Sequence, residues 1–182
     1  MEQSGQYFSF KDYLTEAKGT FTAYHGSGAN FDKFERTKAH AGAGGAAFGS
    51  GIYISKDEKI AKHYKKISKS KNATLYKIKV AIDTDRLMRW DKPFSSQPRP
   101  VQQALMEIGY DESKGSEARY FYHYLRSSFG GGSAKASEQA SQFLEKNGIQ
   151  GIMFIGDRKV NDGKSKNFVI FDPKRIRILE KS

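Results

Sequence analysis

The chain has 182 residues, a length that suits one domain with its own hydrophobic core. It contains no cysteine, which excludes structural disulfides, cysteine-ligated zinc and thiol nucleophiles, and its four histidines lack metal-ligand spacing such as HExxH. The formal net charge of +11 favours an acidic partner such as nucleic acid, although scattered lysines can also serve only to solvate a surface. We therefore expect one soluble domain, without a metal site and without a membrane span.

Strand and helix patterns follow one another in the first third of the chain. Residues 21–25 (FTAYH) and 51–55 (GIYIS) predict short strands, and the glycine- and alanine-rich segment 39–51 between them predicts a mobile loop. Ser55 and Glu58 match a capping box, in which each side chain satisfies a backbone amide of the other residue. A helix should therefore begin there.

This helix should present one apolar face. Ile60, Ala61, Tyr64 and Ile67 share it at helical spacing, so Tyr64 should point the way the core does. The following segment, LYKIKVAID, alternates apolar and polar residues, which predicts a half-exposed strand.

The middle of the chain predicts loops and helices, and its last part predicts strands. The predicted helices cover residues 101–110, 116–127 and 136–148, the last closed by Gly148. The predicted strands cover residues 151–155, 166–172 and 175–180. Strands at both ends and helices between them favour an α+β fold over a regularly alternating parallel sheet.

Common nucleotide and hydrolase motifs do not account for this chain. GAGGAA, residues 42–47, matches the dinucleotide pattern loosely but lacks the preceding strand and following helix, so we reject a Rossmann site. GxxxxGK[ST] and GxSxG are both absent, although residue counts alone do not exclude a Ser-His-Asp hydrolase.

A more specific constellation joins His25 at a strand end, Tyr53 on the next strand, Tyr64 on the following helix and Asn167 at the start of KNFVIFD. Tyr64 lies eleven residues after Tyr53, and the first tyrosine stands in FGSGIY. In order and spacing this constellation resembles the ADP-ribosyltransferase superfamily, in the branch related to diphtheria toxin and the poly(ADP-ribose) polymerases. The resemblance covers roughly residues 21–179 and implies an ADP-ribosyltransferase-like split β-sheet core with flanking helices.

The resemblance also implies NAD as the cofactor and assigns roles to the matching residues. Two aromatic faces grip a flat nicotinamide well, and Tyr53 and Tyr64 would form that sandwich. Backbone groups of Gly26 would hold the nicotinamide carboxamide, where a side chain would block close approach, and His25 would bind the adenosine-side ribose. The implied cofactor-binding residues are thus His25, Gly26, Ser27, Tyr53 and Tyr64, and the implied catalytic residues are His25, Tyr53 and Asn167.

Two positions depart from the family pattern. Asn167 stands where the polymerising enzymes carry a catalytic glutamate, and Ala61 where many carry a serine. An amide can bind a ribose hydroxyl but cannot act as a base, which argues against chain elongation. Transfer of a single ADP-ribose, which we favour, NAD hydrolysis and an inactive fold reused for binding remain open. A carboxylate could come from elsewhere, and the sequence does not choose among Glu35, Glu117, Glu138 and Glu145.

The N-terminal residues 1–19 predict an amphipathic helix, and FKDYLTEAKG within them resembles the capsid-targeting leaders of T-even-type phages, which a prohead protease cuts after Leu-x-Glu. Leu14-Thr15-Glu16 fits, which implies a leader over residues 1–16 and a domain over 17–182; the alternative is a plain amphipathic helix packed on the domain. Cleavage would remove one lysine and three acids, so the charge becomes +11 − 1 + 3 = +13.

The leader resemblance implies a phage effector that is carried in the virion interior and then acts in the host cytoplasm after injection. Its acceptor would be a host protein or nucleic acid, and its basic surface would contact phage DNA. The competing hypothesis is a catalytically inactive internal protein that binds DNA or a host factor.

Overall fold

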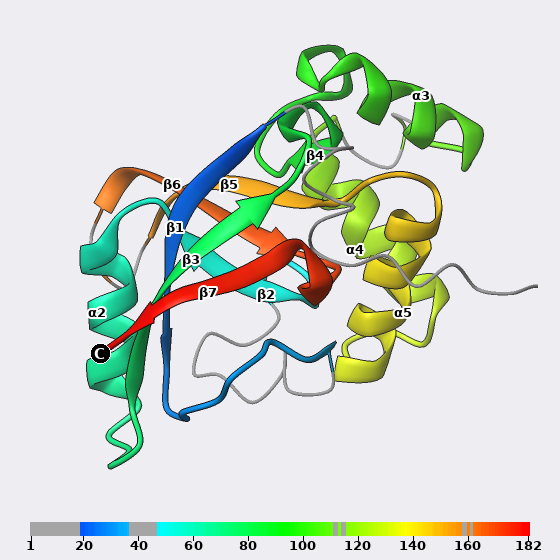
Figure 1. Ribbon diagram of the computed structural model, residues 1–182. Coiled ribbons are helices and arrows are strands. Elements are labelled where there is room, and N and C mark those ends of the chain that lie inside the picture. Colours follow the sequence, from blue (N-terminus) through cyan, green and yellow to red (C-terminus); the bar gives the residue numbers. More distant parts are fainter. Residues whose placement is uncertain (1–18, 37–46, 111–112, 114–115, 158–159, 161) are drawn as a thin grey trace, which may run out of the picture.

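The computed structural model describes residues 19–36, 47–110, 113, 116–157, 160 and 162–182 (Figure 1). The predicted N-terminal helix, the leader and most of the predicted loop 39–51 lie outside these residues. The strands are β1 (Thr20–Ser27), β2 (Ile52–Ser55), β3 (Thr74–Ala81), β4 (Leu87–Arg89), β5 (Gly151–Asp157), β6 (Asp162–Ile170) and β7 (Ile176–Lys181). The α-helices are α2 (Glu58–Ile67), α3 (Arg99–Glu107), α4 (Ala118–Ser128) and α5 (Ala134–Lys146).

The seven strands form one mixed sheet in the order β4-β5-β6-β2-β1-β3-β7. β4 and β5 pair in parallel, and every other pair in this order is antiparallel. β1 and β2 share a single register pair, Tyr24 with Ser55, whereas β1 and β3 pair along eight residues. The sheet is therefore almost split between β1 and β2 into a four-stranded and a three-stranded half.

Each face of the sheet buries its own apolar cluster, because side chains alternate along a strand. On one face α3, α4 and α5 pack over Ile152 and Phe154 of β5 and Val169 of β6. Phe168 and Ile170 of β6 belong to the cluster of the opposite face, together with residues of β1, β2 and β3. Figure 1 shows α3, α4 and α5 gathered on one side of the molecule, while α2 lies beside β1 and β3 on the other.

The predicted α+β fold is confirmed, and the strand predictions near both ends hold. Tyr76, Ile78 and Val80 of β3 are fully buried while Lys77 and Lys79 are half-exposed, as the alternation predicts. In the described residues, no helix combines the length and the hydropathy that a membrane crossing requires.

Several details differ from the sequence predictions. Strand β6 begins at Asp162 and ends at Ile170, so Asn167 lies within the strand and not at its start, and helix α3 begins and ends two to three residues earlier than predicted. Helix α2 is capped by Asp57, whose side chain accepts from Lys59 N at 2.9 Å, whereas Ser55 Oγ accepts from Asp57 N one step earlier. Asp57 is the cap, and not Ser55, because Asp57 lies two residues before a helix amide that has no partner within the helix. Strand β4 was not predicted, since three residues carry too short a pattern. Helix α5 begins at Ala134, because Ser133 caps it.

Candidate active site

His25 lies on β1 where β1 and β2 diverge, and its ring bridges the two halves of the sheet. Its Nδ1 lies 2.7 Å from the carbonyl oxygen of Tyr53 on β2. Burial lowers the pKa of His25, an effect that the bond to Tyr53 only partly offsets, so the ring is neutral near pH 7. A carbonyl only accepts, so Nδ1 carries the proton and Nε2 is left as an acceptor.

Aromatic side chains surround the His25 ring. Phe34 meets it edge-on at 5.2 Å between ring centroids, and Phe31 and Tyr76 lie at 6.3 and 6.0 Å. The Tyr76 hydroxyl fixes the loop that carries Phe31 and Phe34, because it accepts from Phe31 N at 2.7 Å and donates to Ala29 O at 2.9 Å. The segment after β1 is thereby held against the histidine.

Helix α2 leaves no space for a side chain at Gly26. A Cβ at this position would lie 1.9 Å from Ala61 O and 2.7 Å from Lys65 N. The glycine therefore lets the helix backbone approach β1, a reason that differs from the ligand clearance expected from the sequence. Ser27, the next residue, uses its Oγ to accept from Ala29 N at 3.1 Å and so shapes the turn after β1.

Tyr53 holds the segment that leads into β2. Its hydroxyl accepts from Phe48 N at 3.0 Å and donates to Gly49 O at 2.8 Å. Burial raises the pKa of Tyr53, and the neighbouring phenols of Tyr122 and Tyr64 add to the rise, so the side chain is a neutral phenol. The Tyr53 ring packs edge-on against Phe154, with 6.4 Å between ring centroids.

Tyr64, on the second turn of α2, connects this helix to the end of β5. Its hydroxyl donates to Asp157 Oδ2 at 2.9 Å. Burial and the Asp157 carboxylate both raise the pKa of Tyr64, which keeps the phenol protonated and donating. Sequence reasoning missed Asp157.

Asn167 is 3% exposed and turns its amide nitrogen into the β5–β6 hairpin. Nδ2 donates to Gly156 O and to Ser165 Oγ, both at 3.0 Å, and lies 3.4 Å from Ser165 O. These oxygens fix the orientation of the amide, so Oδ1 points the other way and has no hydrogen-bond partner in the described residues. A buried acceptor without a donor is costly and marks a place where a ligand donor would be stabilising.

The structure brings the predicted residues together in two groups. His25 and Tyr53 are joined directly, whereas Tyr64 reaches Asn167 through Asp157 and Gly156. Ser55 links the groups, because it is the register partner of both Tyr24 on β1 and Asn167 on β6.

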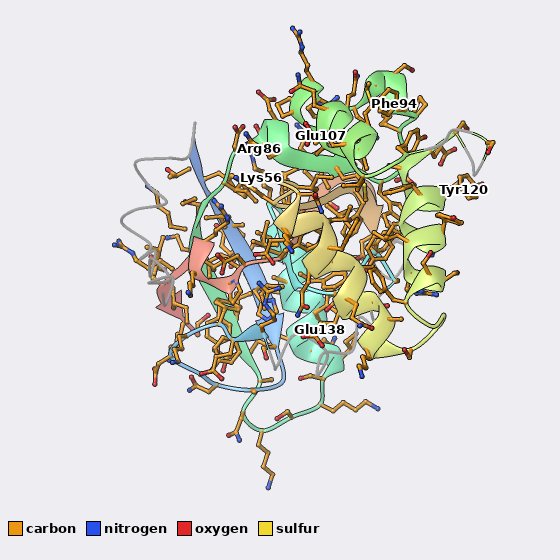
Figure 2. All side chains as sticks on the ribbon, turned by 90° about the vertical axis from the view of Figure 1, so that its right-hand side faces the viewer. Lys56, Arg86, Phe94, Glu107, Tyr120 and Glu138 are labelled. Atoms are coloured by element: carbon orange, nitrogen blue, oxygen red, sulfur yellow. The ribbon has the colours of Figure 1, made fainter. Side chains whose placement is uncertain are left out.

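The four glutamates considered as sources of a carboxylate each contact a residue other than those of the candidate site. Each contacts a polar or basic side chain of its own neighbourhood: Glu145 with Arg36 at 2.7 Å, Glu117 with Arg119 at 2.8 Å, Glu138 with Gln142 at 3.1 Å and Glu35 with Lys33 at 3.5 Å. Figure 2 places Glu138 on α5. Among the residues that the structure describes, no three His, Asp or Glu side chains are grouped to hold a metal ion.

Comparison with known proteins gives one match. The family model described as ADP-ribosyltransferase in polyvalent proteins matches residues 17–181, nearly the whole chain. Searches of curated proteins and of solved structures each found no match.

Proposed function

The chain belongs to the family of ADP-ribosyltransferases in polyvalent proteins, and on this premise we propose that it transfers a single ADP-ribose from NAD to a macromolecular acceptor. The bond between C1′ of the ribose and the nicotinamide nitrogen breaks, and nicotinamide leaves with the electron pair. The acceptor nucleophile forms the new bond to C1′ and loses its proton to solvent. The residues in catalysis are His25, Tyr53 and Asn167.

The observation that carries the proposal is the fixed tautomer of His25. Its Nδ1 proton is committed to Tyr53 O, and burial keeps the ring neutral. Nε2 is therefore an acceptor for a ribose hydroxyl, which is the role that the family resemblance implies for this histidine. A protonated imidazole would offer only donors and would lack this role.

The other predicted cofactor-binding residues also suit NAD. Tyr53 and Tyr64 are neutral phenols on adjacent elements, so their rings offer uncharged aromatic faces for nicotinamide. The buried Oδ1 of Asn167 needs a donor, and a ribose hydroxyl would supply one. Gly26 and Ser27 would contribute backbone groups at the end of β1.

Asn167 supports single transfer over polymer formation. Its amide can hold a ribose hydroxyl but cannot deprotonate the hydroxyl of a preceding ADP-ribose, which elongation requires. Hydrolysis of NAD involves the same bond and differs only in that water is the nucleophile, so product analysis separates the two.

The proposed setting is a phage effector injected into the host cell. It is supported by Leu14-Thr15-Glu16, where a leader over residues 1–16 would be cut, and by the net charge of +11. A basic enzyme could be packed beside phage DNA and then modify a host protein or nucleic acid. N-terminal sequencing of the chain from purified virions tests this setting, and an intact Met1 terminus there would contradict cleavage.

A second candidate is a basic binding protein with a degenerate NAD site. Lys79 and Arg177 are direct register partners on β3 and β7, an arrangement of like charges that a phosphate backbone would stabilise. The Tm measured with and without NAD tests whether the site still binds NAD, because a ligand that binds only the folded state raises the Tm.

The experiment that tests the enzyme is incubation with NAD labelled in the adenylate phosphate, followed by separation of protein and nucleic acid from a host lysate. We expect label in one fraction, equal amounts of free nicotinamide, and loss of both with Tyr64→Ala. Nicotinamide release with label only in free ADP-ribose would identify a hydrolase, and neither product would favour the binding protein.

A further inference from the structure

We propose that Asp157 is the catalytic carboxylate of this site and that Asn167 is the residue that positions it. This inference rests on the proposed function, because it names the group that supplies the charge missing at position 167. Asp157 is the last residue of β5, on the strand beside Asn167, and it lies outside the residues that carry the family resemblance.

Asp157 contacts Tyr64, the residue that we propose stacks on nicotinamide. Its Oδ2 accepts from the Tyr64 hydroxyl at 2.9 Å, and its Oδ1 accepts from Val160 N at 3.3 Å. The two contacts come from different elements and fix both carboxylate oxygens. The negative charge therefore lies at the edge of the ring that would stack on nicotinamide.

An irregularity in the pairing of β5 and β6 directs the Asp157 side chain toward Tyr64. Ile155 pairs with Lys166 and Asp157 with Asp162, so Gly156 alone on β5 lies opposite residues 163–165 on β6. Gly156 has φ +78°, which lies in the left-handed region that favours glycine. Bulges of this kind re-aim the neighbouring side chain, and here that side chain is Asp157.

The Asn167 amide closes this irregularity. Nδ2 donates to Gly156 O on β5 and to Ser165 on β6, so one side chain ties both edges of the widened ladder. A glutamate or aspartate at position 167 would face the carbonyl oxygens of Gly156 and Ser165 with oxygens of its own and would repel them. The neighbours of Asn167 thus require a hydrogen-bond donor at position 167. The carboxylate that we propose for catalysis is Asp157, on the neighbouring strand β5.

Charge is what the reaction needs from Asp157. As the bond between C1′ and nicotinamide breaks, positive charge develops on the ribose, and a fixed carboxylate in a partly buried site stabilises that charge. The carboxylate can also accept from a ribose hydroxyl. It exchanges no proton in this step: the electron pair leaves with nicotinamide and the acceptor's proton goes to solvent.

The test compares Asp157→Asn with the native chain in steady-state release of nicotinamide from NAD, with the Tm measured for both proteins. Asparagine keeps the shape and can keep both contacts, because its Oδ1 accepts from Val160 N while its Nδ2 donates to the Tyr64 hydroxyl. We expect kcat to fall by about 100-fold or more, with the KM for NAD and the Tm little changed. Asp157→Glu should restore part of kcat, whereas a purely structural role would not respond to charge.

The outcomes separate the two proposals. A kcat within about twofold of the native value in Asp157→Asn would overturn the role of Asp157 and leave the transferase standing, since one required charge is worth far more. A lower Tm with a proportionate loss of folded protein, and unchanged kcat per folded molecule, would overturn it too. A native chain that neither binds NAD nor releases nicotinamide would overturn both proposals.

Discussion

The two sides of the candidate site are held in different ways. At β1, β2 and α2, side chains are fixed by backbone groups of adjoining elements: His25 donates to Tyr53 O, and Gly26 packs on the carbonyl of Ala61. At the far end of β5 and β6, they are fixed by a widened ladder that Asn167 ties together. The first arrangement joins three elements that are distant in sequence, and the second lies within one β-hairpin whose register shifts.

We propose that the first side binds NAD and that the second side supplies the negative charge for catalysis. The side with His25, Tyr53 and Tyr64 carries the residues that we propose bind NAD. The β5–β6 end carries Asn167 and Asp157, and Asp157 is the carboxylate that we propose for catalysis. Substitutions on the first side should therefore affect folding and NAD binding, whereas on the second side substitution of Asn167 should affect folding and substitution of Asp157 or Gly156 should affect turnover.

The largest effect is expected at Gly26 on the first side. Gly26→Ala places a Cβ against the backbone of α2, which cannot yield as a flexible side chain would. We expect a loss of about 3 kcal/mol or more in the free energy of unfolding, measured by urea denaturation. Gly132→Ala is the matched control, because a Cβ there meets nothing within 4 Å. Equal stability of the two variants would contradict the close packing of α2 on β1.

The next effect is expected at Asn167 on the second side. Asn167→Asp replaces the buried donor with a carboxylate that faces the carbonyl oxygens of Gly156 and Ser165. The free energy of unfolding should fall by about 2 kcal/mol, because the new carboxylate would be buried and the two carbonyl oxygens would lose their donor. In the control, Asn30→Asp, the oxygen that accepts from exposed Lys181 remains, so stability should hold. A stable Asn167→Asp variant with raised activity would restore position 167 as the catalytic carboxylate.

A smaller effect on stability is expected at Gly156, with a selective effect on turnover. Gly156→Ala forces alanine to φ +78° and should cost about 1 kcal/mol. Gly109→Ala, at φ +80° with open space around it, should cost a similar amount. Only the first should lower kcat for nicotinamide release. Equal kcat values in the two variants would show that the aim of Asp157 does not matter.

The smallest effect is a pH dependence on the first side. Burial lowers the pKa of His25 and, with Arg126 and Arg119, that of His123 below the ordinary value of 6.5. The unfolded chain then binds more protons than the folded chain below about pH 6.5, so stability should be full above that pH and decline as the solution is acidified. His25→Asn should reduce this decline in Tm between pH 7 and 5. An unchanged decline would assign it to other groups.

The sequence predicted the strands and the helix of the first side well because the signals of each element are local. The apolar alternation of β3, the face of α2 and the spacing from Tyr53 to Tyr64 each depend on neighbours within one or two turns or strands. The cap of α2 was assigned to Ser55 instead of Asp57, since both are good caps within one turn.

The second side could not be predicted in the same way. Strand β4 has three residues and owes its existence to parallel pairing with β5 far along the chain. Asp157 acquires its direction from a register shift closed by Asn167, ten residues later in sequence. The available signal was Gly156, because a glycine inside a strand pattern often marks a bulge.

The most direct test of the central claim is ADP-ribose transfer from labelled NAD by the native chain, by His25→Asn and by His123→Asn. Asparagine at position 25 can still donate to Tyr53 O but lacks the acceptor that Nε2 provides. We predict label on a host macromolecule with the native chain and with His123→Asn, and at least a tenfold loss with His25→Asn, on the order of one lost charged or positioning hydrogen bond. Equal transfer by all three proteins, or no nicotinamide release by the native chain, would contradict the account.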